Sequence, residues 1–227
     1  MAILNDLSDY NVRNTAFGFI DCQTSMLEPD SSFKGELEYE DENFRQEILG
    51  NIRRLVTKTS ERLEDALRIF TLWASPLELT AIRKQPMYLL KTPWQQSDAR
   101  NSFMQRINPK FNEPQREDFH PQVRPSIGDV IIEKPYRSAF SDTDLAKMLC
   151  KLGCKALVLS GVRTDKCIYD TAFDGGGCSP PITCIVVEDA VGTQKRDKQR
   201  DHIWHMKNQL ELVKVTTTQK VCDLLDR

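Results

Sequence analysis

The sequence lacks the features that mark several large classes of protein. No apolar run reaches the roughly 18 residues that a membrane span needs. Residues 1–13 lack the basic, then apolar, then small-residue order of a signal peptide. With 31 basic and 33 acidic residues, the net charge is −2, so no basic excess favours nucleic acid. We therefore expect a cytoplasmic protein with no nucleic-acid or membrane partner, with secretion by a leaderless route left open.

Histidine is scarce, and the cysteines do not form a familiar pattern. There are three histidines, and none of the seven cysteines belongs to a C-x-x-C pair. An odd cysteine count without a leader argues against a secreted disulfide framework. A zinc site of cysteine and histidine would have few partners. We therefore expect a reduced chain whose cysteines mostly pack in the interior, and ask whether one differs: Cys22, Cys150, Cys154, Cys167, Cys178, Cys184 or Cys222.

Apolar runs alternate with amphipathic stretches along most of the chain. The apolar runs predict strands at residues 16–20, 67–73, 129–132, 156–159, 183–187 and 212–215. The stretches between them predict helices at about 44–63, 145–152, 165–177, 195–208 and 221–225. Near-continuous apolar strands that alternate with helices are typical of a parallel sheet covered on both faces. The fold class predicted is α/β, as one three-layer α-β-α domain over residues 1–227 with a mainly parallel sheet of about six strands.

Two local features qualify this pattern. Ser141 and Asp144 have the spacing of a capping box, which predicts the start of the helix at 145. Residues 75–124 hold six prolines and few clean periods, so they are predicted to form an irregular insert. The insert is either a substrate-covering lid or a decorated surface loop, and the sequence favours neither.

Three reactive side chains follow or end predicted strands. Asp21 follows the first strand, Lys134 ends the third, and Cys167 begins the helix after the fourth. Ligands of open α/β sheets bind at the carboxyl ends of the strands, so we expect these side chains to meet. A helix start and a nearby lysine favour thiolate, and a carboxylate can accept the thiol proton. Helix-start N–H groups can face an oxyanion. This set needs no histidine for nucleophilic catalysis.

At these residues the chain resembles the isochorismatase-like cysteine hydrolases, which include isochorismatases, nicotinamidases and N-carbamoylsarcosine amidases. The resemblance rests on residues 19–23, 128–134 with 138–140, 161–167 with 171–172, and 186–191. It does not cover residues 75–124. It implies the isochorismatase-like hydrolase fold and a catalytic triad of Asp21, Lys134 and Cys167. It also implies a cis peptide between Val162 and Arg163 that turns the N–H groups of Arg163 and Cys167 toward an oxyanion.

Five further residues are candidates for substrate binding. Gln23 follows the predicted acid and would orient either that acid or the substrate. Arg137 would face an anionic substrate group or be a solvated arginine. Trp73, Tyr136 and Tyr169 would line the pocket or pack in the core. Cys22 is expected to point away from the site, and Cys150 and Cys154 to pack in the core.

Metal binding is not predicted. Asp118 and His120 resemble the Asp-x-His metal ligands of nicotinamidases, but residues 122–133 contain no further histidine. His202 and His205 lie on a charged helix and are expected to be surface or packing residues. The sequence therefore predicts no metal and no cofactor.

The substrate is predicted from the segment around Lys134. Residues 134–140 resemble the isochorismatase form, which favours hydrolysis of isochorismate to a dihydroxybenzoate precursor and pyruvate. In that reaction the acid would mainly protonate the substrate. The alternatives are an amidase that acts on a small carboxamide, nicotinamidase-like or carbamoyl-specific, and a catalytically silent homologue used for binding. The expected partner is a small molecule, and the family resemblance allows a homo-oligomer.

Overall fold

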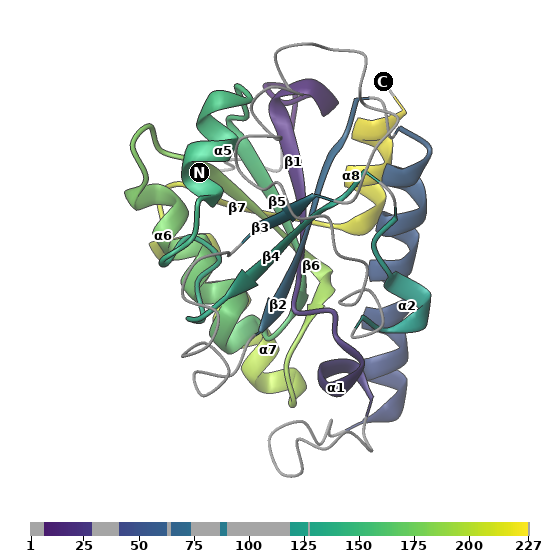
Figure 1. Ribbon diagram of the computed structural model, residues 1–227. Coiled ribbons are helices and arrows are strands. Elements are labelled where there is room, and N and C mark those ends of the chain that lie inside the picture. The colour runs from purple at the N-terminus through teal and green to yellow at the C-terminus, as the bar shows by residue number, and fades with distance from the viewer. Residues whose placement is uncertain are drawn as a thin grey trace.

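A seven-stranded sheet runs through the centre of the computed structural model (Figure 1). The structure describes residues 7–28, 41–62, 65–73, 87–89, 119–126 and 128–226, with 87–89 as backbone alone. The strand order is β3-β4-β2-β1-β5-β6-β7. Six strands are parallel to their neighbours, and β3 pairs antiparallel with β4 at the edge. The strands are β1 (Thr15–Ile20), β2 (Leu67–Trp73), β3 (Met87–Leu89), β4 (Val130–Lys134), β5 (Ala156–Val162), β6 (Thr183–Gly192) and β7 (Val213–Thr216).

Helices cover both faces of the sheet and complete the predicted three layers. On one face lie α2 (Glu42–Ser60) and α8 (Thr218–Leu225), which stand together at the right of Figure 1. The other face carries α5 (Leu145–Lys151), α6 (Tyr169–Gly177) and α7 (Arg196–Gln209). Shorter helical turns are η1 (Val12–Asn14), α1 (Thr24–Leu27), η3 (Pro121–Val123) and η4 (Thr164–Ile168).

The alternation of side chains along β1 divides the core in two. Phe17 and Phe19 pack with the apolar side of α2 and α8, whereas Ala16 and Ile20 pack with the helices of the opposite face. All six residues of β1 are buried, as a central parallel strand requires. The chain leaves β1 toward β2 on one side, and β5 flanks it on the other, so the crevice expected for a ligand lies at the carboxyl end of β1.

The helix α5 begins at Leu145 as predicted, but the predicted capping bonds and the predicted packing of Cys150 are wrong. The side chain of Asp144 makes no capping bond, because Thr143 Oγ1 accepts the N–H of Leu145 at 3.3 Å and Ser141 bonds instead to Asp174 of α6. Cys150 is exposed, since Leu149 and its apolar neighbours already occupy the side of α5 that faces the sheet.

The strand predicted to end at residue 187 continues to Gly192, which is a third error. A register shift between Leu159 and Gly161 of β5 lets the pairing resume at Gly161 with Val191. Most of the insert at 75–124 lies outside the described residues. Within the described ranges, no helix has the length and apolar character to span a membrane.

Candidate active site

Asp21 sits at the carboxyl end of β1 in an uncommon backbone conformation. Its φ is 51°, in the left-handed region, and the residue is 1% exposed. Thr71 of β2 holds it twice: the Asp21 N–H donates to Thr71 Oγ1 at 3.0 Å, and that hydroxyl donates to Asp21 Oδ1 at 2.8 Å. With Oδ1 bonded to Thr71, Oδ2 is left to meet the charged group opposite.

That group is the ammonium of Lys134, the last residue of β4. Lys134 is 0% exposed, and its Nζ lies 2.8 Å from Asp21 Oδ2. The ammonium also donates to the carbonyl oxygens of Tyr136 and Arg137, at 3.3 and 3.0 Å, and lies 4.7 Å from the centre of the Trp73 ring. These contacts neutralise and solvate a buried charge that would otherwise be very costly.

Cys167 lies in η4, between β5 and α6, and completes the group. Its side chain lies close enough to Asp21 and Lys134 for both to shift its pKa. Burial, together with the charge of Asp21, raises the pKa of Cys167 to about 12, although Lys134 acts in the opposite direction. Lys134 favours the thiolate, as the sequence leads one to expect, but burial and the neighbouring carboxylate outweigh it. The resting site holds a thiol next to a carboxylate.

The loop that carries η4 is fixed by close packing and by polar bonds. Gly161 has φ 110°, and a Cβ there would lie 2.1 Å from the Ile20 carbonyl oxygen, so only glycine fits. The Val162–Arg163 peptide is cis, as the resemblance implies. Arg163 pairs with Asp165 at 3.0 Å. Burial works to raise the pKa of Asp165, but the bonds from Arg163 and Thr193 lower it to about 2.

A cavity of about 820 Å³ opens next to the buried lysine. Four of the five predicted substrate contacts line it: Trp73, Tyr136, Arg137 and Tyr169. The side chains of Tyr136 and Arg137 are exposed, and the backbones of the same residues bond to Lys134. The predicted set therefore lines the cavity with three aromatic residues and an arginine, and two of these residues bond through their backbones to the buried ammonium.

Gln23 is placed differently from the other four. Its Oε1 accepts the N–H of Trp73 at 2.7 Å, and its Nε2 donates to the Trp73 carbonyl at 3.5 Å. It does not line the cavity. The described structure thus uses the Gln23 amide to hold the pocket wall, not to face a ligand.

Sequence reasoning missed Thr71 and the acidic wall of the cavity. In the sequence, Thr71 looks like an ordinary residue of an apolar strand. Its polarity is the one available signal, and its place beside Asp21 emerges only from the structure. Asp170 and Asp174 of α6 also line the cavity. Burial raises the pKa of Asp170, while the charge of Arg137 opposes that shift. The helical spacing of these two acids was the available signal.

The histidines and Cys22 have packing or bonding roles in the described structure. His120 is 3% exposed; its Nδ1 accepts the Gln122 N–H, so the proton on Nε2 faces Glu28 at 2.6 Å. Asp118 lies outside the described residues. His202 and His205 contact Tyr169, the latter through the phenol at 3.2 Å. Cys22 is fully buried in the core on the α2 side, and burial and Asp21 raise its pKa.

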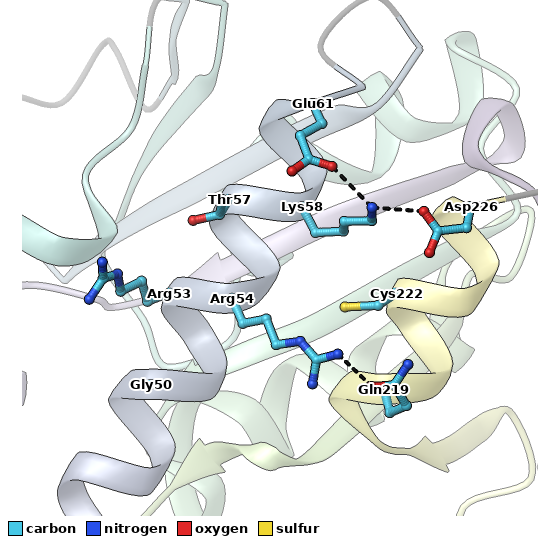
Figure 2. Close-up of a pocket in the computed structure, with 9 residues that line it drawn as sticks. All are labelled: Gly50, Arg53, Arg54, Thr57, Lys58, Glu61, Gln219, Cys222 and Asp226. Carbon is cyan, nitrogen blue, oxygen red and sulfur yellow. Dashed lines mark hydrogen bonds and ion pairs between the residues drawn. The ribbon is translucent and has the colours of Figure 1, made fainter.

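A second cavity, of about 550 Å³, lies between α2 and α8 (Figure 2). Lys58 occupies its centre and bonds to Glu61 and Asp226 at 3.0 and 2.7 Å. Arg54 bonds to Gln219 across the gap. Its one thiol, Cys222, also lies near a lysine–carboxylate pair, Lys58 and Asp226, but these side chains are 28% and 60% exposed, whereas Lys134 and Asp21 are buried. This groove is therefore the weaker candidate for chemistry.

The model of one protein family, the isochorismatase domain, matches residues 15–220. A maleamate amidohydrolase from Pseudomonas putida is 34% identical over 82 residues, which cover 36% of this chain and 38% of that protein. The secreted isochorismatase effector Isc1 from Verticillium dahliae is 35% identical over 71 residues, covering 31% of this chain and 36% of the effector. The chain thus aligns with little more than a third of the length of either relative.

Solved structures extend the comparison to the whole fold. A cysteine hydrolase from Pseudomonas syringae superposes with a TM-score of 0.67 over 100% of this chain and 99% of its own, at 18% identity. At that identity the likeness concerns the fold. Together with the family model, it agrees with the fold that the four sequence stretches predict.

Proposed function

The chain belongs to the isochorismatase family, and on that premise we propose that it is a cysteine hydrolase whose catalytic residues are Asp21, Lys134 and Cys167. The observation that carries the proposal is the contact of a thiol, a carboxylate and an ammonium at one edge of the sheet. Each is at least nine-tenths buried and comes from a different strand end. None of the three lines the cavity of about 820 Å³, but Lys134 contacts three residues that do: Trp73, Tyr136 and Arg137.

The proposed reaction follows from the protonation state of the group. As the sulfur of Cys167 attacks a carbonyl carbon, its proton passes to Asp21, so no free thiolate accumulates. Lys134 pairs with Asp21 at 2.8 Å and limits the cost of charge in the buried site. The N–H groups of Arg163 and Cys167, at the cis Val162–Arg163 loop, would bind the oxyanion. Asp21 then returns the proton to the leaving amine, and the C–N bond breaks.

The second half of the reaction releases the acid. Water attacks the thioester carbon and gives a proton to Asp21. The carbon–sulfur bond breaks, and the sulfur of Cys167 recovers that proton. Asp21 thus acts as base and acid in each half, and the enzyme ends in its starting state.

We favour a small carboxamide as the substrate. Amide hydrolysis needs the nucleophile that Cys167 supplies, whereas cleavage of isochorismate mainly needs a proton donor. The alignment with a maleamate amidohydrolase supports the same choice. Arg137, which lines the cavity, suits a carboxylate on the amide substrate. The prediction from residues 134–140 ranked isochorismate first, and these considerations place it second.

Isochorismate hydrolysis remains the second candidate because of the alignment with a protein named as an isochorismatase effector. The aromatic walls at Trp73, Tyr136 and Tyr169 would also suit its ring. A silent homologue is disfavoured, since a buried acid, lysine and thiol in mutual contact are costly to keep without a use.

A substrate panel tests the proposal. Purified protein is incubated with maleamate, nicotinamide and N-carbamoyl amino acids while ammonia is measured, and with isochorismate while pyruvate is measured. We expect ammonia release that Cys167→Ala abolishes and that Cys150→Ala, a change at an exposed cysteine, leaves intact. Pyruvate release without ammonia release would reject the amidase. Turnover that survives Cys167→Ala would reject the proposed nucleophile.

A further inference from the structure

Thr71 forms a closed pair of hydrogen bonds with Asp21. A hydroxyl has one proton to donate and lone pairs to accept with, and both capacities are used here. Thr71 Oγ1 accepts the Asp21 N–H at 3.0 Å and donates its proton to Asp21 Oδ1 at 2.8 Å. Thr71 is 0% exposed, so the two bonds form away from water.

The two bonds fix different parts of Asp21. The bond to the N–H holds the backbone at φ 51°, a region that residues with a side chain seldom adopt. The bond to Oδ1 sets the plane of the carboxylate, so that Oδ2 points at Lys134 Nζ, 2.8 Å away. The same atom arrangement brings the carboxylate to the Cys167 thiol. A valine has the same shape and would pack equally well in this apolar strand, but it would fix neither the backbone nor the carboxylate plane of Asp21.

We propose that Thr71 is a positioning residue for Asp21. The Thr71 hydroxyl aims the Asp21 carboxylate at Cys167 and stabilises the ionised form of that carboxylate. The inference rests on the proposed function, in which Asp21 is the base. Thr71 does not line the cavity, so its effect would pass through Asp21 and not through substrate contact.

The test compares Thr71→Val with Thr71→Ser. Valine removes the hydroxyl and keeps the shape, and serine keeps the hydroxyl. Losing a hydrogen bond to a carboxylate favours its protonated form. For Thr71→Val we expect the acidic limb of kcat/KM to move up by about one pH unit and kcat near that limb to fall about tenfold, with KM unchanged. Thr71→Ser should restore the wild-type limb to within a few tenths of a pH unit.

A matched control separates positioning from loss of stability. Thr59 is a buried threonine of α2 whose hydroxyl donates to the Leu55 carbonyl at 2.7 Å, far along the chain from Asp21. Thr59→Val should lower the melting temperature and leave the acidic limb in place. If Thr71→Val does not fold, Thr71→Ala should show the same upward movement. An unmoved limb in a folded Thr71→Val or Thr71→Ala variant would overturn the inference.

A second measurement does not depend on turnover. The carboxyl carbon of Asp21 is followed by NMR titration and assigned with Asp21→Asn. Its protonation midpoint should lie at higher pH in Thr71→Val than in the wild type, and Thr71→Ser should match the wild type. Absence of turnover with this difference present would reject the proposed function and keep the role of Thr71. If the wild type is active and the Asp21 midpoint is the same in Thr71→Val as in the wild type, the role of Thr71 is rejected and the proposed function stands.

Discussion

Asp21→Asn should make Cys167 a more reactive thiol while it removes turnover. The carboxylate of Asp21 disfavours a second negative charge beside it, and it is one of the causes that raise the pKa of Cys167 to about 12. An asparagine amide removes that repulsion, and Lys134 then faces Cys167 without a competing anion. In the proposed mechanism, the variant also lacks the base that takes the thiol proton during attack. Reactivity toward a simple alkylating agent and catalysis should therefore change in opposite directions.

The size of the effect follows from Coulomb's law. Two unit charges about 4 Å apart at an effective dielectric of about 20 interact by about 4 kcal/mol, which is about three pKa units. At pH 8 the thiolate fraction of Cys167 should thus rise about a thousandfold. A less basic thiolate is also a weaker nucleophile, with a Brønsted slope of about 0.4–0.5, so alkylation should accelerate about 30- to 60-fold.

The assay is a short pulse of iodoacetamide at pH 8, with each cysteine quantified by peptide mass spectrometry. The exposed Cys150 serves as the internal reference, since its environment does not change. Asp170→Asn is the matched control, because Asp170 is a carboxylate of the cavity wall that is not among the groups that shift Cys167. Equal or slower alkylation of Cys167 in folded Asp21→Asn would refute this electrostatic account of the site.

Three further outcomes test the packing around the site. Lys134→Met should lower the free energy of unfolding by about 3–5 kcal/mol in urea denaturation, because it leaves a buried carboxylate without its cation; a loss under 1 kcal/mol would contradict the buried ion pair. Gly161→Ala should prevent normal folding, since its Cβ would meet the Ile20 carbonyl oxygen at 2.1 Å; a wild-type circular dichroism spectrum and melting temperature would reject that contact. Gly50→Ala should raise stability by about 0.5–1 kcal/mol, because a Cβ there meets nothing within 4 Å on a helix; a lower melting temperature would show the opposite.

Most of the architecture could be read from the sequence because buried parallel strands need apolar runs. The prediction for residues 67–73 coincides with β2, and the first strand differs from β1 by one residue. The errors fall where a contact distant in sequence decides the local structure. Ser141 bonds to Asp174 of α6, and β6 extends past Val187 through renewed pairing with β5. Asp174 lies outside the segment from which the cap was predicted, and β5 lies outside the segment from which the end of the strand was predicted.

The candidate site was predicted only in part, again because some roles depend on contacts between residues that are distant in sequence. Asp21, Lys134 and Cys167 were chosen as strand-end residues, and the structure brings them into contact. Gln23 and Thr71 could not be assigned, because their roles depend on which backbone lies beside them in the sheet. Their bonds cross 50 residues of sequence and result from the pairing of β1 with β2.

The residue types, and the edge of the sheet at which they meet, follow from the sequence, since the carboxyl ends of parallel strands all lie on one side. The scarcity of histidine and the lone cysteine at a helix start already indicated a thiol with an acid and a lysine. The protonation state of Cys167 depends on the folded arrangement and could not be predicted from the sequence. The balance among burial, Asp21 and Lys134 is a matter of distance and exclusion of water, and it leaves Cys167 as a thiol with its pKa raised to about 12.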